Sequence, residues 1–489
     1  MNIAFVPLYI RYLGIESYGL LGLYAIMQAW FGLLDMGLLP ALAREMSRIN
    51  TGKEKEVLAL RDTLRSIEWL VLVFAIVASG CIFAASWWIS TEWLQSNQLP
   101  IADVQNAICL MGIVAATRFM EGIYRSSLAG MQRQVVFNVL SSILATIRGF
   151  GAIAVLAFMS STIQAFFLWQ ITISFLSLAT LAWATYSYLP PAERSGHFSL
   201  KALREISSFA GGMVGIAFLS LLLTQSDKIL LSKLLSLSDL GYYSFSAVAA
   251  SSLSVFVGPI TQAWYPRLVQ LHSSDNPNEL ALTYHQGAQL VSVLLGSASL
   301  VLILFSQLIL ELWTQDIELA KKASPLLSIL AFGNLLHSTM YFPYYAQLAH
   351  GFTGLTIRMN LILVMFVVPA ILVLTPRYGV LGAAYIWMFL NCGYFFIGSH
   401  FFYMKVMPHE KWNWYLYDVL LPLTGCALVL VTLKSALSPP DEVFSQITYL
   451  ALISFSAILA ASICAKHVRS RVISVLEATC LRFSQSLRS

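Results

Sequence analysis

Charged residues are scarce in this sequence, and their scarcity excludes most soluble proteins. Of the 489 residues, only 11% are Asp, Glu, Lys or Arg, while 58% are hydrophobic, and the mean hydropathy is +0.73. A soluble globular protein has about 25% charged residues, because its surface must face water. The composition therefore predicts an integral membrane protein.

Motifs for catalysis and for metal or nucleotide binding are also missing. The six cysteines are scattered, with no CxxC or Cys/His spacing typical of a zinc site or of a disulfide framework. No P-loop, Rossmann glycine pattern, nucleophile elbow or HExxH occurs. The loops between apolar runs are too short to fold as a catalytic domain. We therefore expect no cofactor, no metal and no enzymatic activity, and no transport powered by ATP bound to this chain.

What the sequence does contain is a series of apolar runs, most of them long enough to cross a bilayer. A transmembrane helix needs about 20 apolar residues, and we count about 14 such runs, of which the first is too short and is predicted to be truncated. The runs are 1–10, 18–42, 67–90, 104–130, 135–159, 163–188, 209–231, 240–263, 287–312, 323–349, 357–375, 379–404, 418–437 and 446–465.

The distribution of Lys and Arg predicts the orientation in the membrane. If the N-terminus is cytoplasmic, most of the 29 basic residues fall in cytoplasmic segments, as the positive-inside rule requires. Both termini are then cytoplasmic. The cytoplasmic segments account for the net charge of +5. The sequence has no basic stripe with interleaved aromatic residues, so we expect no nucleic-acid partner. The tail 466–489 fits a basic amphipathic helix on the inner leaflet, or a plain solvated tail.

Two sequence similarities indicate an internal repeat. LGIESYGLLGLY resembles LLSLSDLGYYSF, which aligns Gly19 with Gly241, and YRSSLAGMQRQVVFN resembles YAQLAHGFTGLTIRMN, which aligns Asn138 with Asn360. Both alignments have the same offset, with an even number of spans per repeat, so the repeats are predicted to be parallel. We expect an all-α polytopic fold of two six-helix lobes around a central cavity. Its parts are an N-terminal lobe 1–188, a cytoplasmic linker 189–208, a C-terminal lobe 209–404, two additional spans in 405–465 and the tail.

Ionisable side chains lie inside two neighbouring runs of the first lobe. Arg118, Glu121 and Arg125 have i, i+3, i+7 spacing, which places them on one helix face. Ser141 and Arg148 belong to a polar stripe on the next run, and Arg148 lies roughly 20 Å from its inner end. A charge inside a span costs at least about 2.5–3.5 kcal/mol and usually marks a substrate or ion path. These five residues are the candidate substrate-binding residues.

The arginines favour an anionic ligand. A planar guanidinium binds phosphate or diphosphate through two parallel hydrogen bonds. The alternative is a structural Arg118–Glu121 pair, which would not neutralise Arg148. The repeat offset places Met340 opposite Arg118 and Ala370 opposite Arg148, so the second lobe lacks these charges. A charge that the fold itself required would be expected in both lobes, and the asymmetry therefore favours function.

Four further charged residues are candidates for gating or ion coupling. They are Asp35 and Arg44 in and after the second run, and Asp227 and Lys228 in the seventh. Each has a structural alternative. Asp35 could pair with a neighbouring arginine, Arg44 could be an interfacial anchor, and Asp227–Lys228 could be a local ion pair.

Several blocks resemble a known family. PLYIRYLGIESYGLLGLYAIMQAWFGLLDMGLLPALAREMSR, YRSSLAGMQRQVVFN, QSDKILLSKLLSLSDLGYYS and YGVLGAAY resemble bacterial polysaccharide flippases of the Wzx type, over most of the chain to about residue 404. These belong to the multidrug/oligosaccharidyl-lipid/polysaccharide exporter (MOP) superfamily. The resemblance implies translocation of undecaprenyl-diphosphate-linked oligosaccharide to the outer leaflet for O-antigen or exopolysaccharide assembly. It also implies a location in the bacterial inner membrane, H+ or Na+ coupling, and polymerase and chain-length proteins as partners. Arg118 and Arg148 would then meet the diphosphate or acidic sugars.

Two other functions are alternatives. An ion-coupled multidrug or organic-cation exporter of the same superfamily should have acidic residues in its cavity, whereas the excess here is basic. A membrane polysaccharide polymerase or ligase needs a sizeable outer loop with catalytic groups, and the outer loops here are short.

Overall fold

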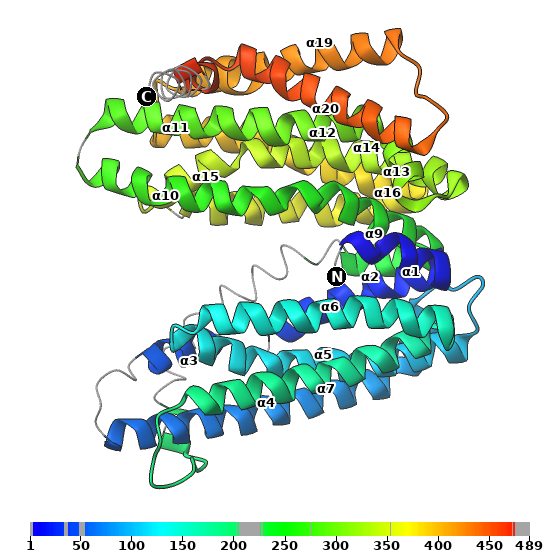
Figure 1. Ribbon diagram of the computed structural model, residues 1–489, viewed down its shortest axis with the longest axis vertical. Coiled ribbons are helices and arrows are strands. Elements are labelled where there is room, and N and C mark those ends of the chain that lie inside the picture. Colours follow the sequence, from blue (N-terminus) through cyan, green and yellow to red (C-terminus); the bar gives the residue numbers. More distant parts are fainter. Residues whose placement is uncertain are drawn as a thin grey trace, which may run out of the picture. The chain divides into compact units, whose positions relative to one another are not determined.

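The structure, a computed structural model, describes residues 3–33, 38–47, 54–201, 203–204, 225, 228–274, 276–352, 354–471 and 473–474. The chain divides into two compact units, Met1–Ser244 and Phe245–Ser489. In the described residues the regular elements are all helices, and the single β-type contact is an isolated bridge between Gln95 and Ser236 (Figure 1). The predicted all-α fold is confirmed.

Apolar composition over long stretches produces helices that can cross a membrane, because a helix satisfies all its backbone hydrogen bonds internally. Within the described residues nine helical segments are long and apolar enough. They are Val57–Trp93, Ile101–Gly130, Gln134–Phe158, Ile163–Tyr188, Leu237–Ser273, Pro277–Leu304, Arg358–Lys405, Lys411–Ala436 and Val443–Cys464. The predicted run 209–231 lies mostly outside the described residues, so the count of about 14 stays a prediction.

The first unit is organised around one central helix. Its helices are α1 (Val6–Leu13), α2 (Ile15–Leu33), α3 (Leu38–Met46), α4 (Glu54–Trp88), α5 (Ile101–Gly130), α6 (Gln134–Phe158) and α7 (Ile163–Tyr188). α5 packs against α2, α3, α4 and α7, while α6 packs against α7 and also contacts α5 and α1 (Figure 1). Gly130 lets α3 approach the end of α5 closely, because a Cβ there would overlap the carbonyl oxygen of Ala43.

Helix α4 begins well before the apolar run 67–90, and this extension holds the segment that follows α7. The Asp62 carboxylate accepts two hydrogen bonds, of 2.8 and 2.7 Å, from the guanidinium of Arg194. The Ser66 hydroxyl oxygen accepts a 2.8 Å hydrogen bond from the backbone N–H of Ser199. Residues 190–199, in the predicted cytoplasmic linker, therefore lie along the first turns of α4.

The second unit begins its helices after the short 3-10 helix η4 (Ser252–Phe256). They are α10 (Val257–Ser273), α11 (Pro277–Val291), the π-helix η5 (Ser292–Gly296), α12 (Ser297–Leu304), α13 (Ser306–Thr314), α14 (Ile317–Thr339), α15 (Tyr341–Ala349), α16 (Gly354–Gly393), the π-helix η6 (Tyr394–Gly398), α17 (Ser399–Lys405), α18 (Lys411–Asn413), the π-helix η7 (Trp414–Leu420), α19 (Leu421–Ala436) and α20 (Val443–Cys464). The boundary between the units falls within α9 (Leu237–Ser251). The C-terminal helices α19 and α20 pack against each other and against α12.

Helix α16 contains a break where two spans were predicted to meet. Gly379 has φ of +57° within α16, a conformation that side-chain-bearing residues rarely adopt. The predicted runs 357–375 and 379–404 are therefore two helical pieces on either side of this glycine. The division into compact units falls at Ser244, whereas the second lobe is predicted to begin at 209. The lobe boundaries stay a prediction.

Candidate functional site

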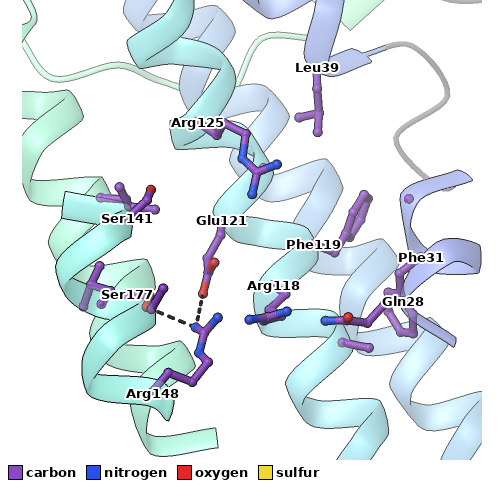
Figure 2. A pocket seen from close by; sticks show the side chains of 16 residues that line it. Gln28, Phe31, Leu39, Arg118, Phe119, Glu121, Arg125, Ser141, Arg148 and Ser177 are labelled. Carbon is purple, nitrogen blue, oxygen red and sulfur yellow. Dashed lines mark hydrogen bonds and ion pairs between the residues drawn. The ribbon is translucent and has the colours of Figure 1, made fainter. Parts of the chain in front are cut away.

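The first unit has a partly open cavity of about 470 Å³ lined by α2, α3, α5, α6 and α7. All five candidate substrate-binding residues line it. The lining residues are Gln28, Phe31, Gly32, Leu39, Ala115, Arg118, Phe119, Glu121, Gly122, Arg125, Ser141, Leu144, Ala145, Arg148, Ser177 and Leu181. Helix α5 supplies one cationic face, and Figure 2 shows that Arg148 of α6 points toward that face. The helical spacing of Arg118, Glu121 and Arg125 predicted that they share one face of α5, and all three line the cavity.

Arg148 is held from three sides. Its Nη2 atom lies 3.6 Å from Oε1 of Glu121 and donates a 3.2 Å hydrogen bond to the hydroxyl of Ser177 on α7 (Figure 2). Its backbone carbonyl accepts a 3.1 Å hydrogen bond from the indole N–H of Trp169. The side chains of Arg148 and Glu121 are only 16% and 11% exposed, so this ion pair is shielded from bulk water.

The pairing of Glu121 differs from the one considered from sequence. The alternative interpretation paired it with Arg118 along α5, three residues away. The ion pair in the structure instead joins it to Arg148 across the α5–α6 contact. Sequence spacing identifies neighbours on one helix, whereas the depth and rotation of the next helix decide which partner comes closer.

Several polar atoms at this site are buried without a hydrogen-bond partner. Among the described residues these include Nε of Arg118, Nε of Arg148 and Oε1 of Glu121. An unsatisfied buried polar group typically costs about 1–3 kcal/mol, and more when it is charged. Three arginines face one glutamate in the described lining, so the site has unused donors and a cationic excess. Both features suit an anion with several acceptor oxygens.

The remaining two candidates at the cavity are less enclosed. Arg125 is exposed, and its guanidinium carbon lies 5.4 Å from the centre of the Phe137 ring. Ser141 is half-buried on α6. They line the cavity beside the Arg118–Glu121–Arg148 group and extend its polar surface.

The candidate gating residues do not gather here. Arg44 is exposed in the last turn of α3, and Lys228 is exposed, with Nζ 3.5 Å from the side-chain oxygen of Gln225. Neither lines the cavity. Asp35 and Asp227 lie outside the described residues.

Sequence reasoning missed Ser177 and a second buried carboxylate, Glu68. Ser177 follows Gln170 and Ser174 at helical spacing on the buried face of α7, and this polar stripe was the signal that could have found it. Oε1 of Glu68 accepts 2.9 Å hydrogen bonds from the hydroxyls of Tyr124 and Tyr186, and Oε2 lies 2.9 Å from Arg65. Both oxygens of Glu68 are satisfied, so this group joins α4, α5 and α7 rather than binding a ligand.

Comparison with known proteins identifies sequences and structures that this chain resembles. Residues 9–316 match the family described as polysaccharide biosynthesis protein. A protein of Shigella flexneri described as "Putative O-antigen transporter" is 22% identical over 380 residues, covering 77% of this chain and 87% of that protein.

Solved structures establish the fold. The lipid II flippase MurJ in an inward closed conformation has a TM-score of 0.65 at 13% identity, covering 94% of this chain and 95% of that one. An inward-facing MATE-family multidrug transporter of the MOP superfamily has a TM-score of 0.63 at 13% identity, covering 84% and 94%. With the family match extending over more than half of its length, the chain belongs to the polysaccharide biosynthesis protein family and has the fold of the MOP transporters.

Proposed function

We propose that this protein is a flippase that moves undecaprenyl-diphosphate-linked oligosaccharide from the cytoplasmic to the outer leaflet of the bacterial inner membrane. The O-antigen or exopolysaccharide pathway would use the product, and the two lobes would alternate access to the substrate. The observation that carries the proposal is a cationic cavity within apolar helices. The family match, the O-antigen transporter relative and the flippase fold support it.

In this proposal Arg118 and Arg148 bind the diphosphate. Their buried Nε atoms have no hydrogen-bond partner, and each guanidinium can offer two parallel N–H groups to phosphate oxygens. At 3.6 Å, the Glu121–Arg148 pair is longer than a well-formed charge-assisted hydrogen bond of about 2.7–2.9 Å. An incoming phosphate oxygen would displace the carboxylate of Glu121, while Ser177 keeps the guanidinium of Arg148 in place.

The size and charge of the cavity bear on the substrate. A volume of about 470 Å³ falls within the range of about 300–1,000 Å³ typical of small-ligand sites. It suits a diphosphate with its first sugar, and the rest of the oligosaccharide would extend beyond it. The cationic excess disfavours the organic cations that a multidrug exporter carries.

Charge removal at the two buried arginines tests the proposal. We expect Arg118→Gln and Arg148→Gln each to reduce surface polysaccharide at least about tenfold, because a hydrogen bond to a charged group contributes about 1.5–3 kcal/mol. The measurement is surface polysaccharide in cells that depend on this protein, with membrane levels checked by immunoblot.

Arg267→Gln is the matched control. Arg267 pairs with Glu279 on the exposed surface of the second unit, and its loss should leave the polysaccharide unchanged. Normal polysaccharide in both cavity variants would show that the arginines do not bind the substrate.

We also propose an H+ or Na+ gradient as the energy source and the polymerase and chain-length proteins of the pathway as partners. Asp35, Arg44, Asp227 and Lys228 remain candidates for gating. The support for these points is the family resemblance alone.

A further inference from the structure

The second unit contains a buried cluster of ionisable side chains that the proposed function does not use. His285 of α11 contacts two carboxylates, one through each ring nitrogen. Its Nδ1 atom contacts Oδ2 of Asp418 in η7, and its Nε2 atom lies 3.0 Å from Oε2 of Glu410, the residue before α18. Asp418 is 1% exposed and His285 is 8% exposed, so the centre of the cluster is shielded from water.

Hydrogen bonds extend this cluster to the segment after α20. The side-chain amide of Gln289 donates a 3.0 Å hydrogen bond to Oδ1 of Asp418. The side-chain oxygen of Gln289 accepts a 2.8 Å hydrogen bond from the backbone N–H of His467. One connected network thus joins α11 to the segment that enters α19 and to the segment that leaves α20. The C-terminal helix pair is fastened to α11 both where the chain enters it, at 410–418, and where the chain leaves it, at 465–467.

A count of protons shows what this geometry requires. A neutral imidazole has one N–H, and ionised carboxylates are acceptors only. Burial favours a raised pKa for Glu410, but hydrogen bonds from Asn413 and His285 outweigh it and hold the pKa below its usual value. Glu410 is therefore ionised at neutral pH and accepts the proton on Nε2. The contact between Nδ1 and Asp418 then requires a second proton, shared between these two groups.

The other titratable groups around the cluster do not supply that charge. The ring of His467 lies 6.5 Å from that of His285, and burial holds the pKa of His467 below its usual value, so it is neutral. The hydroxyl of Tyr284 is hydrogen-bonded to that of Tyr403 at 2.7 Å. His409 acts on Glu410, and Lys466 acts on His467, from the periphery. Arg471 is engaged with Gln286.

We propose that His285, Asp418 and Glu410 form a proton-binding site that fastens the C-terminal helix pair α19–α20 to α11. With the second proton bound, an imidazolium lies between two carboxylates and the network is closed. When that proton leaves, the lone pair of Nδ1 faces the carboxylate of Asp418 in a buried site, and the two repel each other. The network then opens at 410–418 and 465–467. This inference does not depend on the flippase proposal.

Hydrogen–deuterium exchange on the purified full-length protein tests the proton directly. The measured quantity is the protection factor of the peptide 465–471. It is the intrinsic exchange rate of an unstructured peptide at the same pH divided by the observed exchange rate. Because the closed network holds one proton more than the open one, the ratio of closed to open molecules falls about tenfold per pH unit above the ordinary pKa of histidine. We expect this slope in the wild type as the pH is raised above about 6.5, the pKa of a histidine in water.

Asp418→Asn separates the proton from the hydrogen bonds. The new amide can donate to Nδ1 of a neutral His285 and still accept from Gln289, so the network needs no second proton. This variant should remain protected at 465–471 and lose the pH slope. His285→Gln, which removes the titrating ring, should lose the slope as well and serves if Asp418→Asn does not fold.

His272→Gln is the control, because His272 is an exposed histidine of the same unit outside the network, and it should keep the wild-type slope. A flat profile in the wild type would overturn the proposal. So would an unchanged slope in whichever of Asp418→Asn and His285→Gln folds. The exchange measurements need no transport assay. Failure of this proposal can therefore be distinguished from failure of the flippase proposal, which the arginine variants test.

Discussion

At the scale of single residues, the cavity is defined by charges that do not cancel. The spacing of Arg118, Glu121 and Arg125 on α5 was sufficient to predict that they share a face. The 3.2 Å hydrogen bond from Arg148 to Ser177 could not be predicted, because it depends on how α7 is rotated against α6. Sequence therefore predicted which charged residues of α5 share a face, and it missed Ser177 and the contacts between helices.

Under the proposed function, Glu121 competes with the diphosphate for Arg148, and removal of its charge should strengthen binding. We expect Glu121→Gln to lower the Kd for a short-chain polyprenyl diphosphate by roughly 3–10-fold, because a neutral amide is a weaker rival than a carboxylate. Binding can be measured by calorimetry on protein in nanodiscs.

Ser142→Ala is a suitable control for that measurement, since Ser142 is exposed on α6 and outside the cavity lining. An unchanged or higher Kd for Glu121→Gln would mean that the carboxylate helps the ligand to bind, for example by orienting Arg148.

At the scale of helices, apolar runs predicted most elements but not their ends. The run 67–90 correctly predicted a span, yet α4 begins at Glu54, because polar side chains such as Asp62 and Ser66 continue the helix beyond the apolar part and bind 190–199. The break in α16 was predicted by the gap between two runs, and a glycine provides it.

Gly379 supplies a backbone conformation that other residues adopt at a cost. We expect Gly379→Ala to destabilise the protein by about 1–3 kcal/mol, because residues with a side chain rarely adopt the combination of φ +57° and ψ −140°. A Cβ at this site meets no atom beyond the local backbone within 4 Å, so crowding by other parts of the protein does not contribute. The midpoint of thermal unfolding in detergent measures the effect.

Gly354→Ala provides the comparison, because that position is equally open and has no positive φ. It should be neutral or slightly stabilising, as expected for Gly→Ala within a helix. Equal midpoints for the two variants would show that the conformation at Gly379 is not strained.

At the scale of the whole molecule, composition alone predicted the fold class. Few charges and many apolar runs leave only a helical membrane protein, and the structure and the MOP-type neighbours agree. The internal repeat also predicted that the second half lacks counterparts of Arg118 and Arg148. It could not predict the His285 cluster, because its members come from segments more than a hundred positions apart in the sequence.

The excess of basic residues predicts cytoplasmic termini, and reporter fusions can check this. A fluorescent protein fused after Ser489 should fold and fluoresce, because it would stay in the cytoplasm. Alkaline phosphatase fused after Gln315, between α13 and α14, should be active, because it would be exported. The opposite pair of results would invert the orientation, and the end of α6 that lies nearer to Arg148 would then face the cytoplasm.

The tyrosine-bound carboxylate of Glu68 has a mechanical consequence. The hydroxyls of Tyr124 on α5 and Tyr186 on α7 both donate to Oε1 of Glu68 on α4. These three helices are therefore linked through one carboxylate. Helix α6 makes no such link to Glu68 and carries Arg148. The contact between Glu121 and Arg148 thus joins α5, one of the three linked helices, to α6, which is attached to them through Ser177 and Trp169 of α7. If the proposed substrate enters between α5 and α6, we expect α6 to move before the three helices that Glu68 links.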